Sequence, residues 1–250
     1  MGHDGGMPSS FSQQTCAPVD PVSGRALPAA VLWDMDGTLI DTEPYWIAAE
    51  TALVVESGGT WTHEDALSLV GSDLLAAARV LQERGGVRLE RAEIVERLVA
   101  SVSDAMSREM PWRPGAREVL ERLREAGVPC ALVTMSYQVL GERLVAAVPA
   151  GTFAAVVTGD QVTRGKPDPE PYLVAAARLG VDPASCVAFE DSPPGLASAT
   201  ASGARVVGVQ SVLPLPQRAD LSRVPNLEPV DLSMIAAVAA GETFDLLADG

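Results

Sequence analysis

Histidine and cysteine are scarce in this 250-residue chain. It has two histidines and three cysteines, and no two cysteines stand in a C-x-x-C spacing. A histidine-based zinc site or a serine–histidine–aspartate triad is therefore hard to assemble from this sequence. Cys130 and Cys186 lie in apolar, strand-like runs, where a buried, reduced thiol is the usual finding.

Positive charge and long apolar runs are also in short supply. The 18 Lys and Arg residues face 33 Asp and Glu residues, a formal net charge of −15, and such a field repels nucleic acids and anionic membrane surfaces. No apolar run approaches the roughly 18 to 20 residues of a membrane span. The first 28 residues lack the basic and apolar regions of a secretory signal. We therefore expect no nucleic-acid partner, no membrane association, a disordered leader over residues 1–28 and a cytoplasmic location.

What the chain does contain is ample material for a core, since 47% of its residues are hydrophobic. After residue 112, helical patterns alternate with apolar runs, which is typical of a parallel sheet covered by helices on both faces. Residues 43–112 instead hold four helical patterns and no strand. The predicted fold class is α/β, with a Rossmann-like parallel sheet core (residues 29–42 and 113–250) and an inserted α-helical bundle cap (residues 43–112). The expected strands are 30–35, 128–134, 154–158, 186–190 and 204–209.

Charged and hydroxyl side chains follow four of these strands, where ligands of open parallel sheets bind. Clustered carboxylates repel one another unless a cation lies between them, and Mg²⁺ with oxygen ligands fits best. An ammonium group and a hydroxyl suit the oxygens of a phosphoryl group, leaving one aspartate to attack phosphorus. The residues predict phosphoryl transfer without telling nucleophile from acid. In chain order they are Asp34 and Asp36, Thr134 and Ser136, Lys166, and Glu190 and Asp191.

In this order the motifs resemble those of the haloacid dehalogenase superfamily, in the branch with a helical cap after the first motif. The resemblance covers roughly residues 29–210 and implies a Mg²⁺-dependent phosphatase. Such an enzyme hydrolyses small phosphomonoesters, here sugar or polyol phosphates, through an aspartyl-phosphate intermediate. The motifs that carry the resemblance are Asp34-Met35-Asp36-Gly37-Thr38, then Thr134, then Lys166, and finally Glu190-Asp191.

The resemblance also implies a role for each of these residues. Asp34 would be the nucleophile, and Asp36 the general acid that protonates the leaving alcohol and then the base that activates water. Thr134 and Lys166 would hold the phosphoryl oxygens, although Ser136 stays an alternative source of the hydroxyl. Mg²⁺ would be bound by Asp34, the backbone carbonyl of Asp36, and Asp191, with Glu190 as a further ligand or a support for the others.

Two features of the cap bear on the substrate. Trp46 stands about a dozen residues after Asp34, where relatives that act as β-phosphoglucomutases carry histidine. This departure favours a phosphatase over the alternative, a sugar-phosphate mutase. Relatives place specificity residues near Gly71, so Ser72, Asp73 and Trp46 are candidate substrate contacts, with a simple helix cap as the other interpretation of Ser72. A non-catalytic binding protein on this fold is a third possibility. We expect a monomer or weak dimer.

Overall fold

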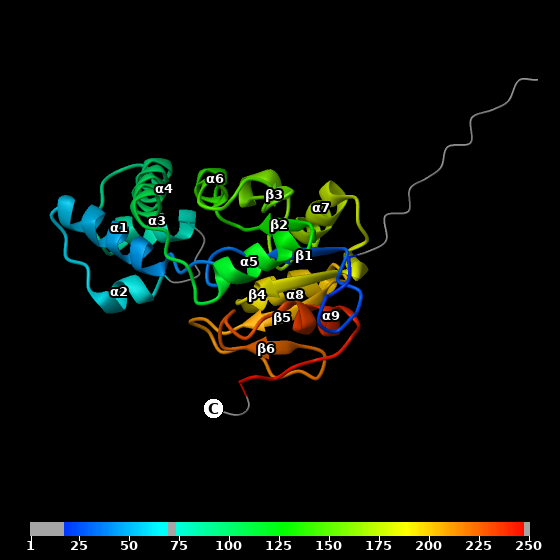
Figure 1. Cartoon of the computed structure of the whole chain (residues 1–250). Coiled ribbons are helices and arrows are strands. Elements are labelled where there is room, and N and C mark those ends of the chain that lie inside the picture. Colours follow the sequence, from blue (N-terminus) through cyan, green and yellow to red (C-terminus); the bar gives the residue numbers. More distant parts are fainter. Residues whose placement is uncertain (1–17, 70–73, 248–250) are drawn as a thin grey trace, which may run out of the picture.

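A central parallel sheet organises the chain. The computed structural model describes residues 18–69 and 74–247 (Figure 1), and within them six strands form one sheet in the order β3-β2-β1-β4-β5-β6, with every neighbouring pair parallel. The order reverses at β1, which pairs with β2 on one side and β4 on the other. The strands are β1 (Ala30–Trp33), β2 (Cys130–Val133), β3 (Ala155–Val157), β4 (Cys186–Glu190), β5 (Arg205–Val209) and β6 (Ser222–Val224).

The strands are apolar throughout because helices cover both faces of the sheet. All four residues of β1 are buried; Val31 and Trp33 belong to the core on one face, and Ala30 and Leu32 to the core on the other. Trp33 stacks on Phe189 of β4 with ring centroids 4.3 Å apart. The first face is covered by α5 (Ala116–Glu125), α6 (Gln138–Ala146) and α9 (Leu232–Ala239), and the second by α7 (Glu170–Leu179) and α8 (Pro193–Ala201).

Four helices between β1 and α5 lie together beside the sheet (Figure 1) and are called the cap helices below. The longest, α4, packs against α1 and α3 and turns an apolar face toward them, as its 3.6-residue pattern predicts. It also contacts α6 of the core, where Arg143 Nε donates a hydrogen bond to Ser103 Oγ at 2.9 Å. The cap helices are α1 (Glu43–Glu56), α2 (His63–Leu67), α3 (Leu74–Glu83) and α4 (Arg91–Arg108).

These elements confirm the predicted fold class, a parallel α/β core with an inserted helical bundle. The predicted domain boundaries stay a prediction. The edge strand β6 and the short 3-10 helices η1 (Gly159–Gln161) and η2 (Pro183–Ser185) were not expected from the sequence. In the described part of the chain, no helix combines the length and the apolar character needed to cross a membrane.

The segment 18–28 differs from the predicted disordered leader. Val19 and Ala26 form an antiparallel bridge. Between them Asp20, which is only 1% exposed, accepts hydrogen bonds from the backbone N–H of Ser23 (2.7 Å) and the hydroxyl of Ser233 in α9 (2.7 Å). A turn closed by one buried carboxylate thus anchors residues 18–28, although their composition suggested disorder. The leader over residues 1–28 stays a prediction.

Helix α5 is bracketed by two glycines with positive φ angles, Gly115 (82°) and Gly127 (70°). A Cβ atom at Gly115 would lie 2.2 Å from the carbonyl carbon of Leu227, whereas one at Gly127 would meet nothing within 4 Å. Only Gly115 therefore combines the left-handed conformation with a close approach of another backbone.

We predict that Gly115→Ala lowers the free energy of unfolding by about 1 to 3 kcal/mol more than Gly127→Ala, because only the first substitution forces an overlap in addition to the conformational penalty. Urea unfolding of the two variants measures the difference. Equal losses would show that the backbone around Leu227 moves aside freely.

Candidate active site

The charged side chains singled out in the sequence lie at the carboxyl end of the sheet, where the strand order reverses. Asp34 directly follows β1, Glu190 ends β4 and Asp191 comes next. The helices that follow these two strands in the core, α5 and α8, cover opposite faces of the sheet, and such a switch point opens a crevice. One carboxylate oxygen from each of Asp34, Glu190 and Asp191 lies within 4.8 Å of the others.

Lys166 ties this cluster together from the loop before α7. Its Nζ donates to Asp34 Oδ1 (2.6 Å) and the carbonyl oxygen of Val133 (2.9 Å), and it forms an ion pair with Glu190 Oε1 (2.5 Å). Its side chain is only 5% exposed. Burial by itself lowers the pKa of Lys166, but the charges of Asp34 and Glu190 outweigh burial and raise that pKa. The ammonium group is therefore kept charged.

Glu190 is fully buried and its carboxylate is saturated with donors. Besides the ammonium group of Lys166, Oε1 accepts the hydroxyl of Tyr172 at 2.8 Å. The other oxygen, Oε2, accepts the backbone N–H of Asp191 (3.1 Å) and both the N–H and the hydroxyl of Ser192 (3.4 and 3.3 Å). Burial and the charge of Glu190 raise the pKa of Tyr172 well above its usual value, so the phenol keeps its proton as a donor.

Asp34 differs from Glu190 in that one of its carboxylate oxygens accepts no hydrogen bond from the described residues. It is buried, and while Oδ1 accepts from Lys166, Oδ2 has no hydrogen-bond partner among the residues that the structure describes. Burial and the charge of Glu190 raise the pKa of Asp34 well above its usual range, although Lys166 opposes the shift. The same two causes raise the pKa of Asp191 to about 7. The cluster is short of positive charge, so these residues fit a divalent metal ion.

Asp36 points toward a separate group of hydroxyls. Its Oδ2 accepts the hydroxyl of Ser136 at 2.6 Å and that of Thr134 at 3.4 Å, and its Oδ1 accepts the hydroxyl of Thr42. Thr134 is buried and also accepts the backbone N–H of Ser136 at 3.0 Å. The structure thus brings both candidate hydroxyls of the second motif to Asp36, and neither is set apart as the phosphoryl ligand.

Gly37 explains why the first motif needs a glycine. Its φ angle is 84°, and a Cβ atom there would lie 1.9 Å from Asp191 Oδ2. Only a residue without a side chain lets the loop after β1 approach the end of β4 this closely. The glycine therefore brings the first and fourth motifs together.

Of the three candidate substrate contacts in the cap, the structure describes only Trp46. Trp46 lies half-buried on α1 and packs against the apolar core, while Ser72 and Asp73 lie outside the described residues.

Two residues near the site were not predicted from the sequence. Tyr172 lies six residues after Lys166, and its position in α7 looks like an ordinary apolar one. The second is Arg113, which connects the end of the cap to the core. Its backbone N–H donates a hydrogen bond to the carbonyl oxygen of Leu39 (2.9 Å), and its guanidinium group donates one to the carbonyl oxygen of Gln210.

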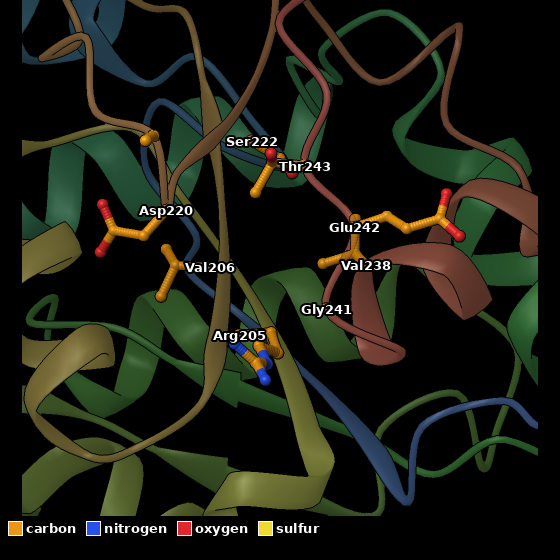
Figure 2. A pocket seen from close by; sticks show the side chains of 9 residues that line it. Arg205, Val206, Asp220, Ser222, Val238, Gly241, Glu242 and Thr243 are labelled. Atoms are coloured by element: carbon orange, nitrogen blue, oxygen red, sulfur yellow. The ribbon is translucent and has the colours of Figure 1, made fainter.

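A cavity of about 260 Å³ lies elsewhere, beside β5, β6 and the end of α9 (Figure 2). Because β5 begins at Arg205 and β6 at Ser222, this cavity lies at the amino ends of the strands. Asp34 lies at the carboxyl ends, on the opposite side of the sheet. Figure 2 shows Asp220 and Glu242 on its two sides, pointing away from one another. We therefore do not assign this cavity to the candidate active site.

The fold and the site together define a Rossmann-like α/β protein with a helical cap and an acidic site at the switch point. The haloacid dehalogenase-like hydrolase family matches residues 31–209. The chain belongs to this family, which confirms the resemblance found in its motifs.

Individual relatives agree with this assignment. Hexitol phosphatase B of Escherichia coli K12 is 31% identical over 216 residues, which cover 84% of this chain and 94% of that protein. The bifunctional riboflavin kinase/FMN phosphatase of Arabidopsis thaliana is also 31% identical, but the match spans only 50% of that longer protein. Among solved structures, CbbY from Rhodobacter sphaeroides in complex with phosphate is 27% identical with a TM-score of 0.71, covering 81% of this chain and 96% of that one.

We predict that Lys166→Met lowers the free energy of unfolding by about 3 to 5 kcal/mol at pH 8, because it leaves buried carboxylates without their cation. The raised pKa of Asp34 rises further in this variant. Stability is then greatest below the unfolded-state pKa and is lost as the pH rises through the folded-state pKa, so the loss should shrink near pH 5. Urea unfolding at both pH values measures it.

Arg164→Met is the matched control for this variant. Arg164 also pairs with two carboxylates, Asp168 (3.2 Å) and Glu170 (3.3 Å), but its side chain is 69% exposed. Water screens such pairs, so this substitution should change stability little. A loss in Lys166→Met that equals the control, or that does not depend on pH, would contradict the prediction.

Proposed function

We propose that the protein is a Mg²⁺-dependent phosphatase that hydrolyses small phosphomonoesters of sugars or polyols through an aspartyl-phosphate at Asp34. The observation that carries the proposal is the buried Oδ2 of Asp34, which lacks a hydrogen-bond donor among the described residues although its partner oxygen is held by Lys166. The relatives named as hexitol phosphatase and FMN phosphatase support the substrate class.

Asp34 and Asp191 are the side chains best suited to hold the metal, with the backbone carbonyl of Asp36 as the family resemblance implies. Both carboxyls have raised pKa values, whereas the oxygens of Glu190 already accept several hydrogen bonds. Glu190 then supports Lys166 and the loop after β4. Mg²⁺, when bound, would supply the positive charge that the cluster lacks and polarise the phosphoryl group.

In the reaction, a carboxylate oxygen of Asp34 forms a bond to phosphorus while the bond from phosphorus to the ester oxygen breaks. Asp36 gives its proton to the departing oxygen. It then takes a proton from the water that attacks phosphorus, and this second step releases phosphate and restores Asp34. Lys166 keeps Asp34 oriented and offers charge to the phosphoryl oxygens.

The hydrogen bond from Thr42 to Asp36 connects this chemistry to the cap. Thr42 is buried and immediately precedes α1. A movement of the cap would therefore shift a hydroxyl that orients the proposed acid and base, so closure over a substrate could complete the site.

The mutase alternative has no observation of its own in the structure, and Trp46 still occupies the position of the mutase histidine. Finding isomerised sugar phosphate with little free phosphate would favour the mutase. Mg²⁺ binding that depends on Asp191, without turnover of any ester, would favour the binding protein. The cytoplasmic location, the absence of nucleic-acid partners and the monomer or weak dimer stay predictions.

We predict that Asp34→Asn reduces Mg²⁺-dependent phosphate release by at least about a thousandfold, because an amide cannot attack phosphorus. Asp36→Asn should also be strongly impaired, since the amide cannot exchange the proton. A panel of sugar and polyol phosphates, assayed with Mg²⁺ and with EDTA, measures the effect. Asp104→Asn, on the exposed surface of α4, is the control. Full activity of Asp34→Asn would exclude the covalent mechanism.

We further predict that the apparent affinity for Mg²⁺ weakens below about pH 7, by up to about tenfold per pH unit, because protons compete with the metal for Asp191. Titration calorimetry in buffers of different ionisation enthalpy measures both the affinity and the protons released. Asp191→Asn should bind Mg²⁺ more weakly and with less dependence on pH. An affinity in the wild type that is constant from about pH 5 to 8 would contradict this assignment of Asp191.

A further inference from the structure

A second buried carboxyl group lies in the cap, and the proposed reaction does not use it. Glu50 of α1 is 5% exposed, and its Oε2 is shielded from solvent and has no hydrogen-bond partner in the described part of the chain. Burial and the charge of Glu43 raise its pKa to about 7. Keeping an unsatisfied carboxyl inside a helical bundle is unfavourable, so Oε2 of Glu50 calls for a partner other than the described residues.

The position of Glu50 on α1 shows where that partner would come from. Residues seven apart lie on one face of a helix, so Glu50 shares a face with Glu43, and Trp46 lies between them. Glu43 is half-buried, and burial followed by the charges of Asp41 and Asp36 raises its pKa. This face of α1 therefore starts beside the loop that carries Asp36.

The distance along this face suits the length of a small substrate. Seven residues of helix advance by about 10 Å, which is comparable with a phosphorylated six-carbon chain in extended form. Helix α1 leads directly out of the loop that follows β1 (Figure 1). A substrate whose phosphoryl group lies at Asp34 and whose carbon chain follows this face from Glu43 would reach Glu50.

The chemistry of the face favours a neutral, hydroxyl-rich group. A carboxyl oxygen without a donor accepts hydrogen bonds from hydroxyls, and the half-buried ring of Trp46, one turn earlier, offers an apolar surface to a carbon chain. Above about pH 7, where Glu50 is ionised, Glu43 and Glu50 together would repel a second phosphate or a carboxylate. The ligand that fits is thus a polyhydroxylated monophosphate rather than a bisphosphate.

We propose that Glu50 and Trp46 form a subsite in the cap that binds hydroxyl groups on the carbon chain of the substrate. This proposal rests on the phosphatase function proposed above and adds a residue that selects the alcohol part of the ester. Glu50 is accordingly a specificity residue, and the phosphoryl transfer is left to the core residues.

The test compares two esters in the full-length protein with Mg²⁺: a hexitol monophosphate and phenyl phosphate, which has no hydroxyls on its organic part. We expect Glu50→Ala to lower the ratio of kcat/KM for the hexitol ester to that for phenyl phosphate at least about tenfold, because a site built for hydroxyls discriminates through them. Glu50→Gln preserves the shape and one acceptor, so its ratio should fall less. An unchanged ratio in both variants would overturn the proposal.

Glu56→Gln is the matched control, because Glu56 lies on the same helix but is 70% exposed and, within the described ranges, forms an ion pair with the surface residue Arg97 at 3.4 Å. It should leave the ratio as in the wild type. Circular dichroism establishes that each variant is folded; if Glu50→Ala is not, Glu50→Gln alone decides.

A binding measurement separates this proposal from the proposed hydrolysis. In an Asp34→Asn background, titration calorimetry with the hexitol monophosphate should show at least about tenfold weaker binding when Glu50 is also replaced, and a smaller change with phenyl phosphate. If the wild type releases no phosphate but this dependence holds, the hydrolysis fails and the subsite stands. If both esters are hydrolysed and neither binding nor the kcat/KM ratio depends on Glu50, the hydrolysis stands and the subsite fails.

Discussion

The ammonium group of Lys166, held between Asp34 and Glu190, is the interaction on which the site depends. Lys166 is the only lysine in the chain, and all its donors are used inside the core. Its one positive charge faces the three carboxylates of Asp34, Glu190 and Asp191. The other hydrogen bonds to the Glu190 carboxylate come from Tyr172, Asp191 and Ser192. Asp34 and Asp191 are therefore the carboxylates whose negative charge is not balanced. That imbalance distinguishes the rim from a closed ion-pair network and suits the proposed cation and phosphoryl group.

The sheet makes this arrangement possible by holding the partners in fixed register. Val31 lies opposite Val187 on β4 and Cys130 on β2, so the ends of these three strands meet at one level. Their side chains are buried on both faces, which leaves little freedom for the loops that carry Asp34, Thr134 and Asp191. Gly37 then removes the last steric obstacle between the first and fourth motifs. Geometry that a flexible loop could not maintain is thereby imposed by packing.

How far the sequence predicts this structure depends on the kind of signal. Apolar runs that end in charged residues place Asp34 and Asp191 at one rim, because strand direction decides where such residues meet. Lys166 reaches the same rim from the loop between β3 and α7. The short strand β6 and the ordered segment 18–28 are not predicted from the sequence, because contacts with residues far away in the chain stabilise them. One such contact is the hydrogen bond from Ser233 to Asp20. The burial of Glu50 is not predicted for a related reason. A glutamate on a helix is expected to be solvated, and only the packing of the cap helices shows that Glu50 is buried.

Two carboxylate oxygens in the described residues are buried without a donor: Asp34 Oδ2 in the core and Glu50 Oε2 in the cap. Asp34 comes before Thr42 in the chain and Glu50 comes after it, so one such oxygen belongs to the core and one to the cap helices. A ligand that lies between core and cap would satisfy both, with its phosphoryl group at the first and its hydroxyls at the second. Thr42, bonded to Asp36, stands where the two parts join. Substrate selection and proton transfer would then be coupled through the position of a single helix, α1.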